Sequence, residues 1–271
     1  MKIGFFDSGL GGLTVLKEAI ENENLREEIV YLGDTKNTPY GVKDKEYVKE
    51  IIEDNIKYLV EQGCNPIVIA CNTATSLCIK NLRNEYPDVC LIGTEPAVKV
   101  AVDSNSNKKI LVLATSITVR EEKLHNLITN LNAEDKVELE PADKLVTFAE
   151  NVNCREMSEE IEEYIASILE KYNLEEFSHI VLGCTHFPLF RENFKRVINK
   201  IDKKLNIEIV DGAKGISNNL INHLNQMKKD KKYISSKYSV TIVTTSKSES
   251  FKKRAEQILD HENIEFKYKL Q

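Results

Sequence analysis

Although the chain contains 271 residues, no apolar run in it approaches the length of a membrane-spanning helix. Its first residues lead straight into the strand-like segment 3–6, without the basic, apolar and small-residue succession of a secretory leader. These two absences predict a cytoplasmic protein with no membrane partner. The length suffices for one large domain or two modest ones.

Cysteine is too sparse for a disulfide scaffold in a chain of this length. The sequence has no Cys-x-x-Cys pair and no cysteine and histidine at zinc-ligand spacing, so we expect no structural metal site. The six cysteines are Cys64, Cys71, Cys78, Cys90, Cys154 and Cys184.

A concentrated basic surface is also missing. The net charge is −6, and lysine and arginine are scattered along the chain instead of forming a stripe. This distribution argues against nucleic acid as the main partner. A negatively charged substrate would gain nothing from the field of the whole protein, so local hydrogen-bond donors would have to hold it.

The chain does have a regular alternation of short apolar strands and amphipathic helices. Apolar residues recur at helical spacing between Asp44 and Gly63, where the glycine suits a C-terminal cap, and again between Ser158 and Tyr172. This alternation predicts an α/β fold with mainly parallel sheets and helices on both faces. The expected strands cover residues 2–6, 29–32, 67–70, 90–93, 110–114, 137–140, 179–183, 207–210 and 239–244.

A weak internal repeat indicates two similar α/β domains. Segments 2–8 and 109–116 both run from an apolar strand into polar residues, and a strand ending in cysteine follows each at a comparable interval. We predict a first domain formed by residues 1–95 and 211–271 and a second formed by residues 96–210. The active site is expected in the cleft between them.

Two cysteine segments carry the strongest chemical signal. Residues 67–73 read IVIACNT and residues 180–186 read IVLGCTH, so each apolar strand ends in a small residue, a cysteine and two hydrogen-bonding side chains. A single cysteine beside a strand is more often a buried apolar residue. Past the carboxyl ends of parallel strands, however, Cys71 and Cys184 would both line the ligand crevice. A thiolate base and a thiol acid on opposite sides of a substrate could invert a carbon centre.

The loop after the first strand, DSGLGGLT, is not a dinucleotide-binding fingerprint, because Thr14 stands where the third glycine is needed. Its glycines suit a tight turn into a helix whose N–H groups bind anions. Asp7 at the strand end is placed to orient an ammonium group or to assist a thiol. The segment is equally consistent with Asp7 or Ser8 simply capping the following helix.

Two more positions have both a chemical and a structural interpretation. Tyr40, in the loop 37–41, has a hydroxyl that could contact a ligand carboxylate, although a half-buried tyrosine in a surface turn is the more frequent case. His186, two residues after Cys184, could activate the thiol or bind the backbone at the strand end.

Three residues outside these motifs are candidates for supporting positions. Thr115 and Thr118 follow the expected strand 110–114, and Thr118 with Glu121 matches the Thr-x-x-Glu capping box, which favours a structural role. Glu150 could be a carboxylate near His186, but a charged helix residue is far more often solvated, and the local sequence does not decide.

Together these segments resemble one known family. The blocks FDSGLGGLTVLKE, YLGDTKNTPYG, IACNTATS, GTEPAVK, LATSITV and VLGCTHFPL look like those of glutamate racemase, in the same order and over nearly the whole chain. The resemblance implies a two-domain α/β enzyme that interconverts L- and D-glutamate without a cofactor and supplies D-glutamate for peptidoglycan synthesis. It also implies a homodimer.

The same resemblance assigns roles to residues of the motifs. It makes Cys71 and Cys184 the two acid/base residues, Cys71 on the D-face and Cys184 on the L-face, with Asp7 and His186 assisting proton transfer. The substrate-binding residues that it implies are Asp7, Ser8, Pro39, Tyr40, Gly41, Asn72, Thr73, Thr185 and His186. Thr115, Thr118 and Glu150 are the supporting positions around the site.

Two other interpretations stay open. A racemase or isomerase of the same superfamily could act on aspartate or another substrate, which a substrate panel would distinguish. A non-catalytic binding protein could use the same fold, and it would exchange no α-proton of glutamate with solvent.

Overall fold

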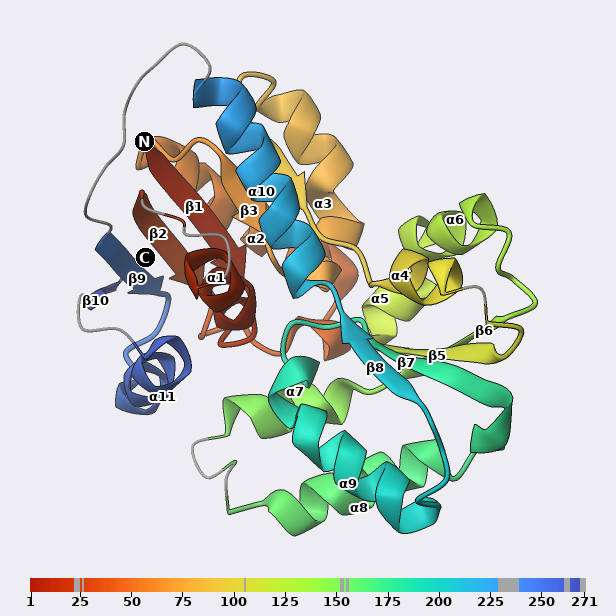
Figure 1. Cartoon of the computed structure of the whole chain (residues 1–271). Coiled ribbons are helices and arrows are strands. Elements are labelled where there is room, and N and C mark those ends of the chain that lie inside the picture. Colours follow the sequence, from red (N-terminus) through yellow and green to blue (C-terminus); the bar gives the residue numbers. More distant parts are fainter. Residues whose placement is uncertain are drawn as a thin grey trace.

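The computed structural model describes residues 1–21, 25, 27–104, 106–151, 154, 156–228, 239–260 and 264–268. Its strands form two sheets, each covered by helices, in neighbouring parts of the molecule (Figure 1). All the strand pairs described are parallel, which confirms the expected α/β fold. No helix within the described ranges is long and apolar enough to cross a membrane.

The larger sheet has six strands in the order β10-β9-β2-β1-β3-β4. The chain returns to it at the end, because β9 pairs in parallel with β2, from Ser239 opposite Glu28 to Thr244 opposite Gly33. The C-terminal strands β9 and β10 thus extend the sheet that contains β1 and β2. The strands are β1 (Lys2–Asp7), β2 (Glu28–Gly33), β3 (Ile67–Ile69), β4 (Leu91–Gly93), β9 (Ser239–Thr244) and β10 (Ile264–Tyr268).

The smaller sheet has four strands in the order β6-β5-β7-β8. These are β5 (Lys109–Ala114), β6 (Val137–Pro141), β7 (Phe177–Leu182) and β8 (Glu208–Asp211). The order β2-β1-β3-β4 of the larger sheet is the same as the order β6-β5-β7-β8 of the smaller one, strand for strand. The internal repeat is therefore real at the level of topology, and β3 and β7 are equivalent strands.

Helices cover both faces of each sheet because successive strand residues point to opposite sides. Phe5 packs in a core with α1, α10 and α11, whereas its neighbour Phe6 packs in another with α2 and α3. In the second unit, Leu111 faces α7, α8 and α9, and Val112 faces α4 and α6. Burying both faces explains why the central strands are almost continuously apolar.

The helices are α1 (Gly12–Glu21), α2 (Lys45–Glu61), α3 (Asn72–Glu85), α4 (Val98–Asp103), α5 (Ser116–Arg120), α6 (Glu122–Asn130), α7 (Asp143–Glu150), α8 (Ser158–Leu169), α9 (Arg191–Ile201), α10 (Ala213–Lys228) and α11 (Glu249–Leu259). Three short 3₁₀ helices join them: η1 (Tyr40–Val42), η2 (Leu174–Glu176) and η3 (Phe187–Phe190). Both helices expected from periodicity form, as α2 and α8. Gly63 follows α2 with φ of +76°, the left-handed conformation that a glycine cap adopts.

Two expectations about local structure are wrong. Strand β10 was not expected, because its segment IEFKY alternates apolar and charged residues over only five positions at the edge of the sheet. The capping box does not form either. Thr115, not Thr118, is the N-cap of α5, and its hydroxyl accepts the N–H of Thr118, while Glu121 only begins the next helix.

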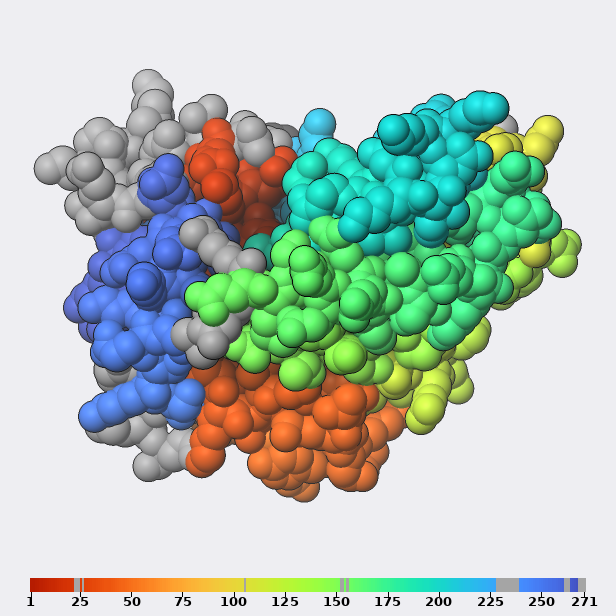
Figure 2. All heavy atoms as spheres, turned by 90° about the horizontal axis from the view of Figure 1, so that it is seen from below, coloured from red at the N-terminus to blue at the C-terminus, as the bar shows by residue number. Residues whose placement is uncertain are grey.

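The two units meet along a boundary formed by loops and helix ends. Figure 2 shows α11, in blue, lying against the green segment that contains α7 and α8, with N-terminal residues in red behind them. The loops that follow β1, β3, β5 and β7 all open towards this boundary (Figure 1). Most predicted site residues follow these four strands directly, whereas Pro39, Tyr40 and Gly41 follow β2 and Glu150 ends α7. The fold therefore brings the two halves of the site together.

Candidate active site

Asp7 joins the two units through its buried carboxylate. It is the last residue of β1 and has no exposed surface. Its Oδ1 accepts the N–H of Gly9 at 3.0 Å, and its Oδ2 accepts the hydroxyl of Thr185, from the other unit, at 2.9 Å. Burial raises the pKa of Asp7, although the charge of His186 and these hydrogen bonds act in the opposite direction.

Cys71 is the N-cap of α3 and lies two residues after the end of β3. The thiol donates to Ser8 Oγ at 3.8 Å and accepts the N–H of Ala74 at 3.5 Å. Only 4% of its surface is exposed. Burial raises the pKa of the thiol far above its ordinary value, and the charge of Asp7 adds to this effect. Together they outweigh the favourable field of the helix N-terminus, so Cys71 is a neutral thiol.

Cys184 stands at the equivalent place, two residues after the end of β7, and is 6% exposed. Its sulfur lies 3.8 Å from His186 Nδ1, and the other ring nitrogen of His186 lies 2.6 Å from Glu150 Oε1. Burial lowers the pKa of His186, but the hydrogen bonds from Cys184 and Glu150 and the negative charge of Glu150 raise it well above 6.5 overall. The two ring nitrogens of His186 thus face one partner each, which fixes the imidazole between Cys184 and Glu150.

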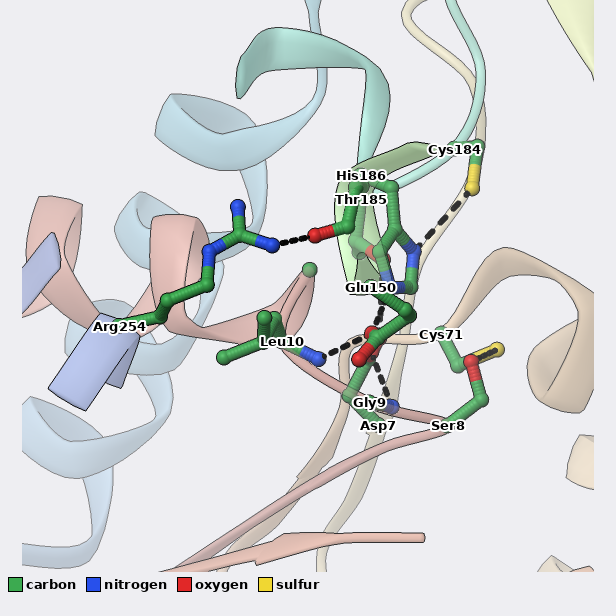
Figure 3. Close-up of polar contacts among 12 residues, drawn as sticks. Asp7, Ser8, Gly9, Leu10, Cys71, Glu150, Cys184, Thr185, His186 and Arg254 are labelled. Carbon is green, nitrogen blue, oxygen red and sulfur yellow. Dashed lines mark hydrogen bonds and ion pairs between the residues drawn. The ribbon is translucent and has the colours of Figure 1, made fainter. Parts of the chain in front are cut away.

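Glu150 is the last residue of α7 and connects the two units a second time. Its Oε1 also accepts the N–H of Leu10, at 2.7 Å. Figure 3 shows the glutamate between His186 and the loop at Gly9 and Leu10, with both cysteine sulfurs on the same side of this group. A Cβ on Gly9 would overlap the Glu150 carboxylate, so glycine is required there for the close approach.

A cluster of three threonine hydroxyls lies across the boundary near Cys71. Thr73 Oγ1 is 2.9 Å from that of Thr115 and 3.3 Å from that of Thr118, and the last two are 2.9 Å apart. Thr73 belongs to α3, whereas Thr115 and Thr118 belong to α5 and its N-cap. The predicted binding residue and two predicted supporting residues thus form one hydroxyl network.

Tyr40 has a different environment from the one expected. It is almost fully buried instead of half-buried, and its hydroxyl donates to Asp34 Oδ2 at 2.6 Å. The buried Asp34 carboxylate also accepts from the Asn37 amide and from the Thr245 hydroxyl. Tyr40 therefore shapes its loop, and its hydroxyl proton is already committed to Asp34.

The rest of this loop faces the second unit. Pro39 precedes η1, and Gly41 lies so near α7 that a Cβ on it would overlap Asp143 Oδ1 and lie 2.8 Å from Thr115 Cβ. The Asp143 carboxylate accepts the N–H of Ser116 at 3.1 Å and is hydrogen-bonded to the Ser116 hydroxyl. The backbone of the loop, not a side chain, thus forms this wall of the boundary.

Asn72 is the one predicted binding residue whose buried oxygen has no protein partner. Its Oδ1 and the hydroxyl of Thr94 are both buried and without a hydrogen bond. Both residues line a cavity of about 10 Å³ beside Cys184 and Thr185. That volume is at the lower limit for a single water. Asn72 thus offers a free acceptor next to the second cysteine.

Three residues of this region were not predicted as site residues: Asp34, Asp143 and Arg254. Arg254, on α11, donates from Nη1 to the carbonyl oxygens of Ala149 and Asn151, the latter at 3.0 Å. Because these partners are about a hundred positions away in the sequence, helical periodicity could not reveal the contact. Asp34 could have been predicted from the sequence, because it directly follows the apolar strand β2, as Asp7 ends β1.

Metal-ligating side chains are not gathered at the site. Within the described ranges, no three His, Cys, Asp or Glu residues lie close enough together to hold a metal ion. Instead, Cys71 lies beside the Ser8 hydroxyl, and Cys184 lies beside His186, whose other ring nitrogen contacts Glu150. The arrangement is suited to moving protons at two separate thiols.

Known proteins with similar sequences were found for most of the chain. The model of the Asp/Glu/Hydantoin racemase family matches residues 14–216. The glutamate racemase of Halothermothrix orenii is 46% identical over 226 residues, which cover 83% of this chain and 86% of that protein. The glutamate racemase of Clostridium botulinum is 37% identical over 265 residues, which cover 95% of this chain and 96% of that protein.

Solved structures agree with these sequence matches. A glutamate racemase isoform from Bacillus anthracis superposes with a TM-score of 0.85 at 26% identity, over 99% of this chain and 97% of that one. The glutamate racemase of Aquifex pyrophilus superposes with a TM-score of 0.73 at 31% identity, over 98% of each chain. By the family model and these relatives, the chain belongs to the Asp/Glu/Hydantoin racemase family and, within it, to the glutamate racemases.

Proposed function

We propose that the chain interconverts L- and D-glutamate by moving a proton between substrate and two thiols, Cys71 and Cys184. The observation that carries this proposal is the equivalence of their positions, two residues past the matching strands β3 and β7. The two thiols also lie close enough for the charge of Cys184 to affect the pKa of Cys71. Two acid/base groups in one cleft, delivered by separate units, suit attack on opposite faces of one carbon.

In the direction from L- to D-glutamate, Cys184 as a thiolate takes the α-proton. The electron pair of the broken C–H bond stays on the α-carbon and its carboxylate. The neutral thiol of Cys71 then donates its proton to the opposite face, which leaves Cys71 as the thiolate. The reverse direction exchanges the two roles. His186, hydrogen-bonded to Cys184, supports proton transfer on that side.

We expect the ammonium group of glutamate to bind near Asp7 and Asn72. Asn72 has a buried oxygen without a partner, and an ammonium has only donors to offer. A positive charge beside Asp7 and Cys71 would also lower both raised pKa values. Substrate binding would therefore ease ionisation of Cys71 where it is needed. The substrate carboxylates would be held by neutral donors, from Ser8, Thr73 and Thr185 and from loop N–H groups.

Substrate entry requires the two units to separate. Both thiols are nearly covered, and the cavity beside Cys184 has room for about one water, whereas glutamate is several times larger. The contacts that must break include Glu150 with Leu10 and Thr73 with Thr115, which join the two units. When the units close again, water is excluded and the local hydrogen bonds become stronger.

The proposal is tested by isotope exchange. Dialysed, metal-free protein is incubated with L-glutamate in D2O, and circular dichroism and α-proton NMR are followed together. We expect optical activity to decay while deuterium appears at the α-carbon. Aspartate and other amino acids serve as the substrate panel. A requirement for pyridoxal phosphate or a metal, or preference for aspartate, would contradict the proposal.

The roles of the two cysteines are tested with Cys71→Ser and Cys184→Ser. Each change replaces a thiol by a far weaker acid, so we expect kcat/KM to fall by at least about 100-fold, as for loss of a general acid or base. Cys78→Ser, at a buried cysteine seven residues after Cys71 on α3, is the control. Full activity of either active-site variant would end the two-thiol mechanism.

Several consequences of the family stay part of the proposal. They are the supply of D-glutamate to peptidoglycan synthesis in the cytoplasm, the domain boundaries at residues 95/96 and 210/211, and the homodimer. The boundary at 95/96 falls between β4 and α4, whereas that at 210/211 falls inside β8 (Glu208–Asp211), one residue before the strand ends. Light scattering of the purified protein measures the oligomeric state.

A further inference from the structure

Helix α7 is the element that presents Glu150 to His186, and its end is fastened from the other unit. Arg254 lies on α11, which packs on the larger sheet, while α7 packs on the smaller one. The Arg254 guanidinium donates to the carbonyl of Ala149, directly before Glu150, and to that of Asn151, directly after it. In Figure 3, the arginine approaches Glu150 from the side opposite the two sulfurs.

The chemistry of this contact is favourable for holding a helix end. The last carbonyl groups of a helix lack partners within the helix, and a cation there also complements the helix dipole. The guanidinium supplies several N–H donors in a fixed plane, so one side chain can hold two carbonyls. The Glu150 backbone is therefore held on both sides, while its carboxylate contacts Leu10 and His186.

We propose that Arg254 is a positioning residue of the racemase, which holds the C-terminal end of α7 so that Glu150 meets His186 when the cleft is closed. Arg254 does not touch the substrate in this scheme. It acts through Glu150 and His186 on Cys184 alone, and not on Cys71. The inference rests on the proposed function for the roles of these residues, and its structural part, the placement of Glu150, can be measured separately.

The kinetic test uses Arg254→Met, with Lys253→Met as its control. Lys253 is an exposed lysine on the same helix, so the control removes the same charge without removing the contact. We expect Arg254→Met to lower kcat/KM about 10- to 100-fold, the range for small misplacement of a catalytic group. Arg254→Lys, which keeps a cationic donor, should recover part of the loss. The control should keep wild-type activity.

The direction of the isotope effects separates positioning from general damage. Enantiomers have equal free energy, so kcat/KM must fall equally in both directions. Weaker support of Cys184 raises only the barrier at that thiol. We therefore expect the α-deuterium isotope effect on kcat/KM to increase with L-glutamate and to decrease with D-glutamate. Equal changes in both directions, or none, would contradict an action through Cys184.

Titration of His186 by NMR tests the placement of Glu150 without any turnover. The charged or titratable groups facing His186 are Glu150, Cys184 and Asp7. Loosening Glu150 removes a partner that raises the pKa of His186, so in Arg254→Met we expect the imidazole to lose its proton at lower pH than in the wild type. His186→Gln assigns the signal.

An unchanged His186 titration together with unchanged kinetics would overturn the inference, and so would lower thermal stability with an unchanged titration. An inactive wild-type protein would instead count against the proposed function. Even then, the titration would still decide whether Arg254 places Glu150.

Discussion

At the scale of single residues, the site contains acidic groups that are buried, and burial disfavours their ionised forms. Asp7 has no exposed surface, and burial raises its pKa from the ordinary 3.8. An acid whose pKa is raised in the folded state favours folding only while it is protonated. The contribution of Asp7 to the free energy of unfolding is therefore fully present below pH 3.8, the unfolded-state pKa. It is lost as the pH rises through the folded-state pKa. Once it is ionised, the buried carboxylate destabilises the fold relative to its neutral form.

Asp7→Asn should show this cost directly. The amide has nearly the same shape and keeps an oxygen for the Gly9 N–H and an NH₂ group for Thr185, so we expect a higher Tm than the wild type at pH 7. The difference should shrink as the pH falls through the raised folded-state pKa towards 3.8, because wild-type Asp7 becomes neutral over this range. Racemisation should fall. Calorimetry at several pH values measures the effect, and a lower Tm at pH 7 would show that the charge is well compensated.

At the scale of elements, close backbone approaches decide how loops of one unit fit helices of the other. Gly41 in η1 lies against Asp143, at the start of α7, and Gly9 lies against Glu150 at its end. Helix α7 thus contacts the first unit at both ends, and glycine supplies the space each time. In contrast, a Cβ added to Gly215 in α10 would have no atom within 4 Å, and this glycine has no positive φ.

The pair Gly41→Ala and Gly215→Ala should therefore give opposite results. At Gly41 the methyl group would overlap the Asp143 carboxylate and meet the Thr115 side chain at 2.8 Å, so α7 must move. We expect Gly41→Ala to reduce kcat/KM at least about tenfold by disturbing closure. Gly215→Ala should raise stability by about 0.5–1 kcal/mol with unchanged activity, because alanine is the better helix residue. Steady-state kinetics and denaturant unfolding measure both, and equal activity of the two variants would refute this account of closure.

At the scale of the whole molecule, the two units close over both thiols. Cys71 and Cys184 are 4% and 6% exposed, whereas Cys90 and Cys154 are partly exposed. We expect reagents to reach these two nearly covered cysteines mainly when the units separate. The same motion admits glutamate, so accessibility of the thiols reports on the opening that the proposed function requires.

Alkylation by iodoacetamide, followed by mass spectrometry of each cysteine, tests this closure. We expect Cys71 and Cys184 to react at least about tenfold more slowly than Cys90, since burial and, for Cys71, a raised pKa both disfavour the reactive thiolate. D-Glutamate should slow the two site cysteines further and leave Cys90 unchanged. Reaction of Cys71 as fast as Cys90 would mean that the resting protein is open.

The sequence was sufficient for everything that depends on local pattern. Alternation of apolar residues predicted the parallel α/β fold and nine of the ten strands described, because a strand buried on both faces must be apolar at successive positions. The repeated small residue, cysteine and polar pair pointed to Cys71 and Cys184. The sequence pattern did not predict strand β10, because an edge strand needs few buried apolar residues. The capping box predicted at Thr118 does not form, because Thr115, three residues earlier, caps the same helix.

Only the tertiary structure decided which distant groups meet. It placed Glu150 on His186, committed the Tyr40 hydroxyl to Asp34, and brought Arg254 to the end of α7 across 105 positions of sequence. Local periodicity reports which face of an element is buried, but it carries no information on which loop lies opposite. The two cysteines could therefore be identified as site residues from the sequence alone. The partners that surround them depend on how two separately formed sheets pack against one another.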